Sequence, residues 1–211
     1  NGMHMSAVKS EGYDGAGFMC VAADDGATLS LEGCDLTCEY DLAVVQIGNS
    51  GTAATISGCC VHDGASTGVL IHSGASATLE NNNIHSSTMA GQAGVQVAGE
   101  GSEAVLRGNR IHDGKAEGVI IASGASATLE NNTITDNDLA GFTIAGHATA
   151  TLTGNTIKGN GQCKIERTEE ELATWPESRV ALYRSPNGFP GVRVLNHSTV
   201  TMPPGSNTIE G

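Results

Sequence analysis

Apolar and polar residues alternate with a period of two in short segments of this chain, and the segments recur about every 23 residues. Around Leu79, for example, Ala77 and Leu79 belong to one face of a segment, and Thr78 and Glu80 belong to the other. Alternation of this kind predicts short strands. The Gly-Val-Leu-Ile segment that precedes it predicts another strand with an apolar face. We therefore expect three short strands in each repeat.

Repeats of this length cannot bury their own apolar faces, so consecutive copies must stack into a solenoid. The abundance of glycine (29 residues) and the low aromatic content (3%) suit a narrow coil of small aliphatic side chains. We predict an all-β parallel β-helix of about seven turns, with residues 1–211 as a single domain. Neither end shows a capping segment, so we expect partner proteins or further chain to cover the ends. One apolar position aligns the turns: Leu31, Ile56, Leu79, Leu106, Leu129, Leu152 and Met202.

Three residues after most of these positions lies a polar or thiol residue at a tight corner. An inward Asn at such a corner can bond to its own turn and to the Asn stacked about 4.8 Å away in the next turn. The first two positions hold Cys, which can be small buried thiols or, alternatively, a disulfide between neighbouring turns. The predicted ladder consists of Cys34, Cys59, Asn82, Asn109, Asn132, Asn155 and Asn207.

Two kinds of turn alternate along the chain. One reads Arg-Gly-Asn-Arg-Ile-His-Asp-Gly in Arg107–Gly114 and is echoed in Cys59–Gly64; the other reads Leu-Glu-Asn-Asn-x-Ile, as in Leu79–Ile84. This alternation resembles the right-handed parallel β-helices of the pectate-lyase-like, carbohydrate-binding-and-sugar-hydrolysis repeat class. Within that class it is most similar to the repeat region of F-box-only protein 11 and its relatives. The resemblance implies a right-handed coil, but the chain has no F-box sequence, so it implies no ubiquitin-ligase role.

Length variation between repeats falls at one corner, after the Asn-x-Ile strand, and the longest insertion spans 161–190. Thr168 followed by three Glu has the form of a capping box, which predicts a short helix to about Trp175. Tryptophan and arginine are frequent at interaction hot spots, so the insertion can bind a partner; alternatively, it covers the solenoid with a small core of its own. Its candidate binding residues are Arg167, Trp175, Arg179, Tyr183, Arg184 and Phe189.

The same corner carries a column of ionisable residues. Rows of His and carboxylate about 4.8 Å apart could hold a metal or share acid and base work. The alternative is that His-Asp-Gly is a turn sequence with a solvated His. We expect no metal site, because ligands must converge and parallel columns diverge outward. The candidate catalytic residues, if the protein is an enzyme, are His62, Asp63, His112, Asp113 and Asp136.

The net charge of −13 argues against nucleic acid as a partner and against direct binding of polyanions, unless a bound cation inverts the local field. No segment approaches the roughly 20 apolar residues of a membrane span, and no signal-peptide pattern is visible, which favours an intracellular location. The six cysteines do not have the spacing of a zinc motif. We expect no cofactor, except calcium if the protein is an enzyme.

These observations favour a protein-interaction or assembly module, in which a rigid β-helix presents variable loops and the insertion to a protein partner or a glycan. The alternative is a polysaccharide-active enzyme of the lyase, hydrolase or epimerase class. The strand face on which such enzymes place their chemistry offers no carboxylate here, because its outward residues are Gln46, Leu70, Gln96, Ile120, Thr143 and Arg193.

Overall fold

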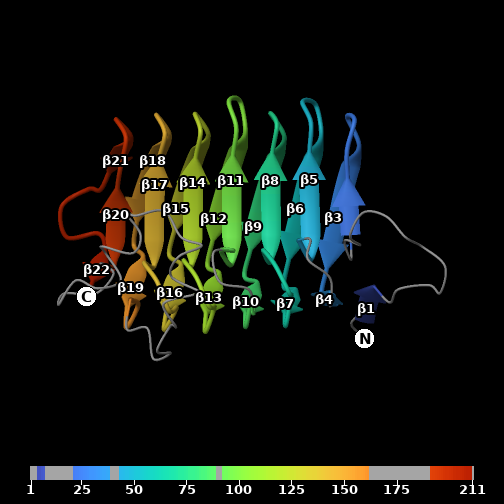
Figure 1. Ribbon diagram of the computed structural model, residues 1–211, viewed down its shortest axis with the longest axis horizontal. Helices are drawn as coiled ribbons and strands as arrows, with labels where there is room; N and C mark the ends of the chain where they lie inside the picture. Colours follow the sequence, from blue (N-terminus) through green and yellow to red (C-terminus); the bar gives the residue numbers. More distant parts are fainter. Residues whose placement is uncertain (1–3, 8–20, 39–42, 89–91, 162–190, 211) are drawn as a thin grey trace, which may run out of the picture.

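The computed structural model describes residues 4–7, 21–38, 43–88, 92–161 and 191–210, and within these ranges every regular element is a β-strand. The strands form three parallel sheets of eight, seven and seven members. Figure 1 shows the strands of each sheet side by side along the long axis of the molecule, from β1 at one end to β22 at the other. The predicted parallel β-solenoid is therefore the architecture of this chain.

Each repeat contributes one strand to each sheet, in the order sheet B, sheet C, sheet A. Sheet A comprises β1 (His4–Ala7), β4 (Asp35–Cys38), β7 (Cys60–His62), β10 (Asn83–His85), β13 (Arg110–His112), β16 (Thr133–Thr135), β19 (Thr156–Lys158) and β22 (Thr208–Ile209). Sheet B comprises β2 (Val21–Ala23), β5 (Val45–Gly48), β8 (Val69–His72), β11 (Val95–Ala98), β14 (Val119–Ala122), β17 (Phe142–Ala145) and β20 (Val192–Val194). Sheet C comprises β3 (Thr28–Glu32), β6 (Ala53–Ser57), β9 (Ser76–Glu80), β12 (Glu103–Arg107), β15 (Ser126–Glu130), β18 (Thr149–Thr153) and β21 (Thr199–Thr201).

The interior is a stack of aliphatic side chains in register. Leu79, Leu106 and Leu129 pair in neighbouring strands of sheet C and are fully buried. Burial of such columns is the main stabilising term of a solenoid, since each turn covers the next. Met202 differs from the other aligned positions: it is 38% exposed, because β21 ends at Thr201 and Met202 lies beyond the strand.

Sheet B strands begin after a glycine column whose members lack space for a side chain. A Cβ built on Gly68, Gly94 or Gly118 would lie 2.6, 2.9 or 2.7 Å from the carbonyl oxygen of the glycine in the next turn. Contacts this short force the backbone to move. The Gly-Val pattern in the sequence thus marks the place where consecutive turns pass closest together.

The asparagine ladder runs along the corner between sheets C and A. The Asn109 side chain donates to the Leu79 carbonyl at 2.8 Å and to Asn132 Oδ1 at 3.0 Å, and its Oδ1 accepts from the Asn82 backbone N–H at 3.0 Å. The same pattern repeats from Asn82 to Asn207, and four of its five asparagines are buried. The ladder therefore satisfies polar backbone groups that the tight corner removes from water.

Cys34 and Cys59 occupy the first two ladder positions as free, buried thiols. The Cys34 backbone N–H donates to Cys59 Sγ at 3.4 Å, and the Cys59 N–H donates to Asn82 Oδ1 at 2.9 Å. The column is thus continuous, with thiols in place of amides, and the alternative of a disulfide does not hold.

Arg107 on sheet C forms ion pairs with Glu80 at 3.2 Å and Glu130 at 2.8 Å, as the alternating signs in neighbouring turns suggest. No helix of the described part is long and apolar enough to cross a bilayer. The predicted helix from Thr168 and almost all of the insertion 161–190 lie outside the described residues.

Candidate functional site

The outer face of sheet A brings together three histidines, a cysteine and an aspartate of the described residues. Its strands alternate, so that Leu36, Val61, Ile84 and Ile111 point inward and are fully buried or nearly so. Their neighbours on both sides point outward and line up in two columns along the sheet. One column contains Asp35, Cys60, Asn83, Arg110 and Thr133; the other contains Thr37, His62, His85, His112 and Thr135.

Three imidazole rings stack in the second column. The ring centroids of His62 and His85 lie 5.3 Å apart with planes 9° apart, and those of His85 and His112 lie 5.0 Å apart with planes 17° apart. The separation follows from the spacing of neighbouring strands, because each His takes the same position in its own strand. Asp63 and Asp113 have the left-handed backbone of the expected turn, but the side chain of His112 is only 9% exposed and that of His62 is 22% exposed, so these rings are largely packed and not fully solvated.

The two outer rings of the stack are held by hydrogen bonds at both nitrogens. His62 bonds through Nδ1 to Asp63 Oδ2 at 2.8 Å and through Nε2 to Asp35 Oδ1 at 2.7 Å. His112 bonds through Nδ1 to Asp113 Oδ2 at 2.6 Å and through Nε2 to Asn83 Oδ1 at 2.9 Å. Each ring is therefore fixed in orientation by oxygen acceptors on both sides.

Burial and neighbouring charge move the pKa of His62 and His85 in opposite directions. Burial by itself would lower the pKa of His62, but hydrogen bonds to Asp63 and Asp35 and the charges of both carboxylates raise it overall. Burial lowers the pKa of His85, and the neighbouring His112 and His62 lower it further. The middle ring is therefore the one that stays neutral most readily, because it is flanked by imidazoles and not by carboxylates at hydrogen-bonding distance.

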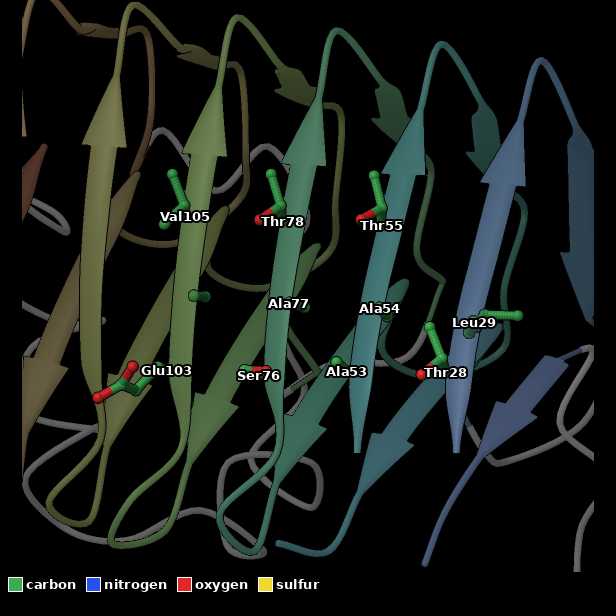
Figure 2. A pocket seen from close by; sticks show the side chains of 11 residues that line it. Thr28, Leu29, Ala53, Ala54, Thr55, Ser76, Ala77, Thr78, Glu103 and Val105 are labelled. Carbon is green, nitrogen blue, oxygen red and sulfur yellow. The ribbon is translucent and has the colours of Figure 1, made fainter. Parts of the chain in front are cut away.

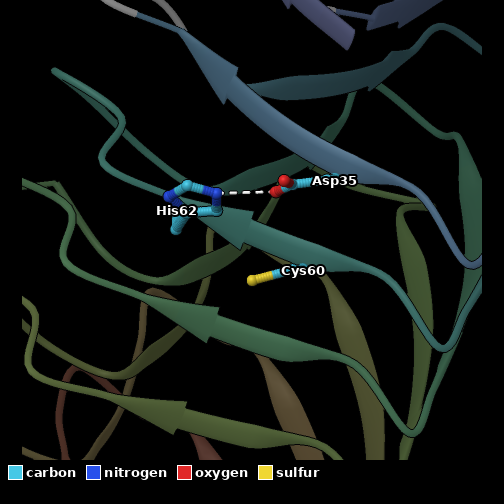
Figure 3. A group of neighbouring side chains, drawn as sticks. All are labelled: Asp35, Cys60 and His62. Atoms are coloured by element: carbon cyan, nitrogen blue, oxygen red, sulfur yellow. Dashed lines mark hydrogen bonds and ion pairs between the residues drawn. The ribbon is translucent and has the colours of Figure 1, made fainter. Parts of the chain in front are cut away.

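Cys60 lies beside this stack and links the two columns. Its Sγ is 3.6 Å from His85 Nε2 and accepts a long hydrogen bond from the Asn83 side-chain amide at 3.9 Å. Burial raises the pKa of the Cys60 thiol, the Asn83 contact lowers it, and the charges of Asp35 and Asp63 raise it again. Ligand atoms of Asp35, Cys60 and His62 all lie within 4.8 Å of one another (Figure 3).

Sequence reasoning did not find Asp35 or Cys60, and its argument that the columns diverge is wrong at this place. The two columns belong to the same face of sheet A. Cys60 and His62, which are two residues apart in β7, therefore lie close to Asp35 in the neighbouring strand β4. The signal in the sequence was Cys-Val-His, whose first and third residues face the same side of a strand, with Asp35 in register with Cys60.

Calcium does not fit this donor set. Calcium takes six to eight oxygen ligands, whereas the group formed by Asp35, Cys60 and His62 offers sulfur and nitrogen beside one carboxylate. No second group of three or more such ligands occurs among the described residues. The expectation of calcium under the enzyme alternative stays a prediction.

Asp113 and Asp136 follow sheet A at equivalent corner positions in neighbouring turns. They come directly after His112 and Thr135, which pair in register, and their φ values of 55° and 57° give them the same left-handed backbone conformation. Both side chains are accessible; that of Asp113 is 60% exposed. The backbone positions of Asp113 and Asp136 are thus one strand spacing, about 4.8 Å, apart at the corner that follows sheet A.

A second asparagine ladder supports this corner, and sequence reasoning missed it. The Gly114 backbone N–H donates to Asn137 Oδ1 at 3.1 Å, and the Asn137 amide donates to Asn160 Oδ1 at 2.9 Å and to the Ile111 carbonyl at 3.3 Å. Both asparagines are buried. The signal was their separation of 23 residues, the same as that between Asn132 and Asn155 in the first ladder.

Sheet C offers a different surface, a shallow groove of about 250 Å³ over a row of small side chains. Figure 2 shows Thr55, Thr78 and Val105 in one row on neighbouring strands, with Glu103 at the margin. Hydroxyls and methyl groups of this kind can contact a ligand but supply no acid or base, apart from Glu103. The outer face of sheet A is therefore the better candidate for chemistry.

The structure leaves some predicted site residues unplaced. His62, Asp63, His112, Asp113 and Asp136 all lie on the outer face of sheet A or at its corner. All six predicted binding residues of the insertion lie outside the described residues: Arg167, Trp175, Arg179, Tyr183, Arg184 and Phe189.

Comparison with known proteins identifies the family. The family model described as right handed beta helix region matches residues 43–202, most of the chain, so this chain belongs to that family. No curated protein matches it at a significant level. Among solved structures, the pectate lyase Pel9A is similar at 15% identity with a TM-score of 0.53, over 98% of this chain and 69% of the lyase. The A-module of the mannuronan C-5 epimerase AlgE4 from Azotobacter vinelandii matches at 10% identity with a TM-score of 0.36, over 86% of this chain and 64% of the module.

Proposed function

We propose that this member of the right-handed β-helix family acts on a polysaccharide, with Asp113 and Asp136 as its pair of reacting carboxylates. The observation that carries the proposal is their equivalent placement in neighbouring turns, at the accessible edge of sheet A. Fold likeness to a pectate lyase agrees with a polysaccharide as the class of substrate, while the residues themselves point to the reaction.

Glycoside hydrolysis suits the spacing of the two carboxylates. Neighbouring strands place equivalent positions about 4.8 Å apart, and retaining glycosidases separate their two carboxyl groups by about 5–5.5 Å. In such a reaction one carboxylate attacks the anomeric carbon as the other protonates the leaving oxygen. Water then cleaves the glycosyl ester, and the second carboxylate takes the proton from that water.

The neighbours of the two carboxylates assign them to different roles. Asp113 accepts a hydrogen bond from His112, which Asn83 holds from the other side, so its carboxylate is oriented and suits the nucleophile. The residue before Asp136 is Thr135, whereas the residue before Asp113 is His112, and we assign Asp136 as the general acid. Gly159 leaves room for it, because a Cβ there would lie 2.7 Å from Asp136 Oδ1.

A neutral polysaccharide agrees better with the charge of this chain than a uronate polymer does. The net charge is −13, and carboxylates line the proposed site, so a polyanion would be repelled. The exposed Arg110, in the column beside His112, can bind hydroxyl groups of a sugar. Among the lyase, hydrolase and epimerase classes, we therefore propose hydrolysis.

The test is release of reducing ends from a panel of neutral and acidic polysaccharides by the wild-type chain and three variants. We expect Asp113→Asn and Asp136→Asn each to lower the rate about 100-fold or more, as for other acid and base groups. Glu103→Gln, an exposed carboxylate on sheet C, should leave the rate unchanged. Absence of release from every polysaccharide, or full activity of both Asn variants, would overturn the proposal.

Stereochemistry separates the finer assignment from the general one. Retention of the anomeric configuration, followed by NMR during hydrolysis, is expected for the Asp113–Asp136 spacing. Inversion would reject this pair as nucleophile and acid while leaving a polysaccharide as the substrate.

The hypothesis of a protein-interaction module remains a prediction from the sequence, because its binding residues lie in 162–190. The similarity to the repeats of F-box-only protein 11 likewise remains a prediction. Affinity capture with the full chain and with a copy lacking 162–188 tests the interaction module. A discrete protein lost on deletion would support it.

A further inference from the structure

Four neighbouring side chains from three adjacent strands of sheet A lie on its outer face. Asp35 lies on β4, Cys60 and His62 lie on β7, and His85 lies on β10. Asp35 pairs in register with Cys60, and His62 pairs in register with His85. The ligand atoms of Asp35, Cys60 and His62 lie within 4.8 Å of one another, and His85 adjoins this group through its Nε2, which is 3.6 Å from Cys60 Sγ. Figure 3 shows the His62 ring joined to Asp35 by a hydrogen bond, with Cys60 beside them.

We propose that Asp35, Cys60, His62 and His85 bind one zinc ion. A carboxylate, a thiolate and two imidazoles are ligand types that zinc takes in proteins, and four is its usual number in closed sites. The sulfur and nitrogen donors disfavour calcium and magnesium, which prefer oxygen. The ligands come from three turns and include a single cysteine, which explains why the sequence shows no zinc-motif spacing of its cysteines.

Two of the distances within the group are close to those of tetrahedral coordination. Zinc binds sulfur at about 2.3 Å and imidazole nitrogen at about 2.0 Å, so the two donors stand about 3.5 Å apart in a tetrahedral site. Cys60 Sγ and His85 Nε2 are 3.6 Å apart. His62 Nε2 and Asp35 Oδ1 are 2.7 Å apart, a hydrogen bond that must open by roughly half an ångström for both atoms to bind the ion.

The remaining nitrogens of both imidazoles are already anchored away from the ion. His62 Nδ1 bonds to Asp63 Oδ2 at 2.8 Å, and His85 Nδ1 bonds to Ser86 Oγ at 3.0 Å. Each Nε2 therefore faces another member of the group: that of His62 faces Asp35, and that of His85 faces Cys60. A carboxylate or hydroxyl on the far nitrogen is the usual support of a zinc-binding histidine.

Zinc at this place would join three turns of the solenoid and neutralise part of the acidic surface. The zinc site is distinct from the carboxylate pair Asp113 and Asp136, and zinc binding does not depend on the proposed hydrolysis. The two sites are linked, because Asn83 contacts Cys60 through its amide nitrogen and His112 through its oxygen. Loss of the ion would therefore disturb the hydrogen bond between Asn83 and His112.

The experiment strips the full chain with a chelator, adds Zn²⁺ alone, and measures stoichiometry by elemental analysis and affinity by titration calorimetry, with no polysaccharide present. We expect one zinc per chain. Cys60→Ala and His62→Gln should each weaken the affinity about 100-fold or more, since loss even of a supporting residue costs 10–100-fold. The control is His147→Gln, an exposed histidine in a separate stack with His197.

Substitution by Co²⁺ gives a readout that a merely structural change would not mimic. A tetrahedral site with a thiolate produces strong visible bands and a sulfur-to-cobalt charge-transfer band, and Cys60→Ser should remove the latter. Circular dichroism of the metal-free variants checks that they fold. Failure of the wild type to retain zinc, or zinc binding by Cys60→Ala and His62→Gln as tight as that of the wild type, would overturn the site.

Discussion

His62 and His85 stack face to face with centroids 5.3 Å apart, yet their pKa values move in opposite directions. Two carboxylates hold His62, whereas His85 has imidazoles on both sides, with Cys60 and Ser86 at its nitrogens. Two adjacent protonated rings would repel each other. The pair therefore shares one charge most readily, with the proton on the ring that faces Asp35 and Asp63.

Stability of the metal-free chain should depend on pH with opposite signs for these two histidines. The pKa of His62 is raised above its ordinary 6.5, so its contribution to folding is complete below 6.5 and is lost as the pH rises through the raised value. The pKa of His85 is lowered, so its contribution is present above 6.5 and is lost as the pH falls through the lowered value.

Unfolding of wild type, His62→Gln and His85→Gln in chelator, from about pH 5 to about pH 9, measures both effects. The destabilisation caused by His62→Gln should shrink as the pH rises. For His85→Gln the stability relative to wild type should improve as the pH falls. The charged and titratable groups that face these two histidines are Asp35, Asp63, Asp113, Cys60 and His112. A parallel pH dependence of the two variants would contradict the opposite shifts.

Asn109→Ala should destabilise the fold strongly, because it breaks the ladder in the middle. The change leaves the buried carbonyl of Leu79 and the buried N–H of Asn82 without their partner. We expect a loss of about 3–5 kcal/mol in the free energy of unfolding, measured by denaturant titration.

Two other variants control for this result. Asn109→Cys should cost less, since Cys59 in the same column accepts a hydrogen bond from the Cys34 backbone N–H and donates one to the Ser57 carbonyl. Val105→Thr, on the outward column where Thr78 and Thr128 stand, should stay within about 0.5 kcal/mol. Equal losses for Ala and Cys at position 109 would show that the ladder needs the amide specifically.

Gly118→Ala tests the close approach of consecutive turns. The new methyl group would lie 2.5 Å from Ile134 Cγ2 and 2.7 Å from the Gly141 carbonyl oxygen. The strand must shift, at a cost of about 1–3 kcal/mol in the free energy of unfolding. Gly191→Ala is the matched comparison, because its nearest contact, Ile209 Cγ2, is 3.1 Å away, and it should cost less in the same denaturant titration.

Arg107→Met should change the melting temperature less than Asn109→Ala does, although Arg107 contacts both Glu80 and Glu130. All three side chains are more than one third exposed, so water screens the ion pairs. Thermal unfolding at low and high salt is the measurement. A large, salt-sensitive loss would mean that the pairs act as a network.

Period-two alternation and the recurrence of Leu79, Leu106 and Leu129 determined the solenoid from the sequence, because each apolar residue can be buried only by its copy in the next turn. The ladder positions followed for the same reason, as an Asn at an inward corner has few partners except the next Asn. The helix from Thr168 stays a prediction, since those residues are not described.

Only the tertiary structure shows which outward side chains of neighbouring turns come into contact. The sequence shows that Cys60 and His62 share a strand face, but the approach of Asp35 from β4 and His85 from β10 depends on register between turns of 25 and 23 residues. Turn lengths vary at the corner after sheet A, so separation along the chain does not reveal register. Stacking of the buried core sets the register, and thereby brings Asp35, Cys60 and His62 together, with His85 beside Cys60.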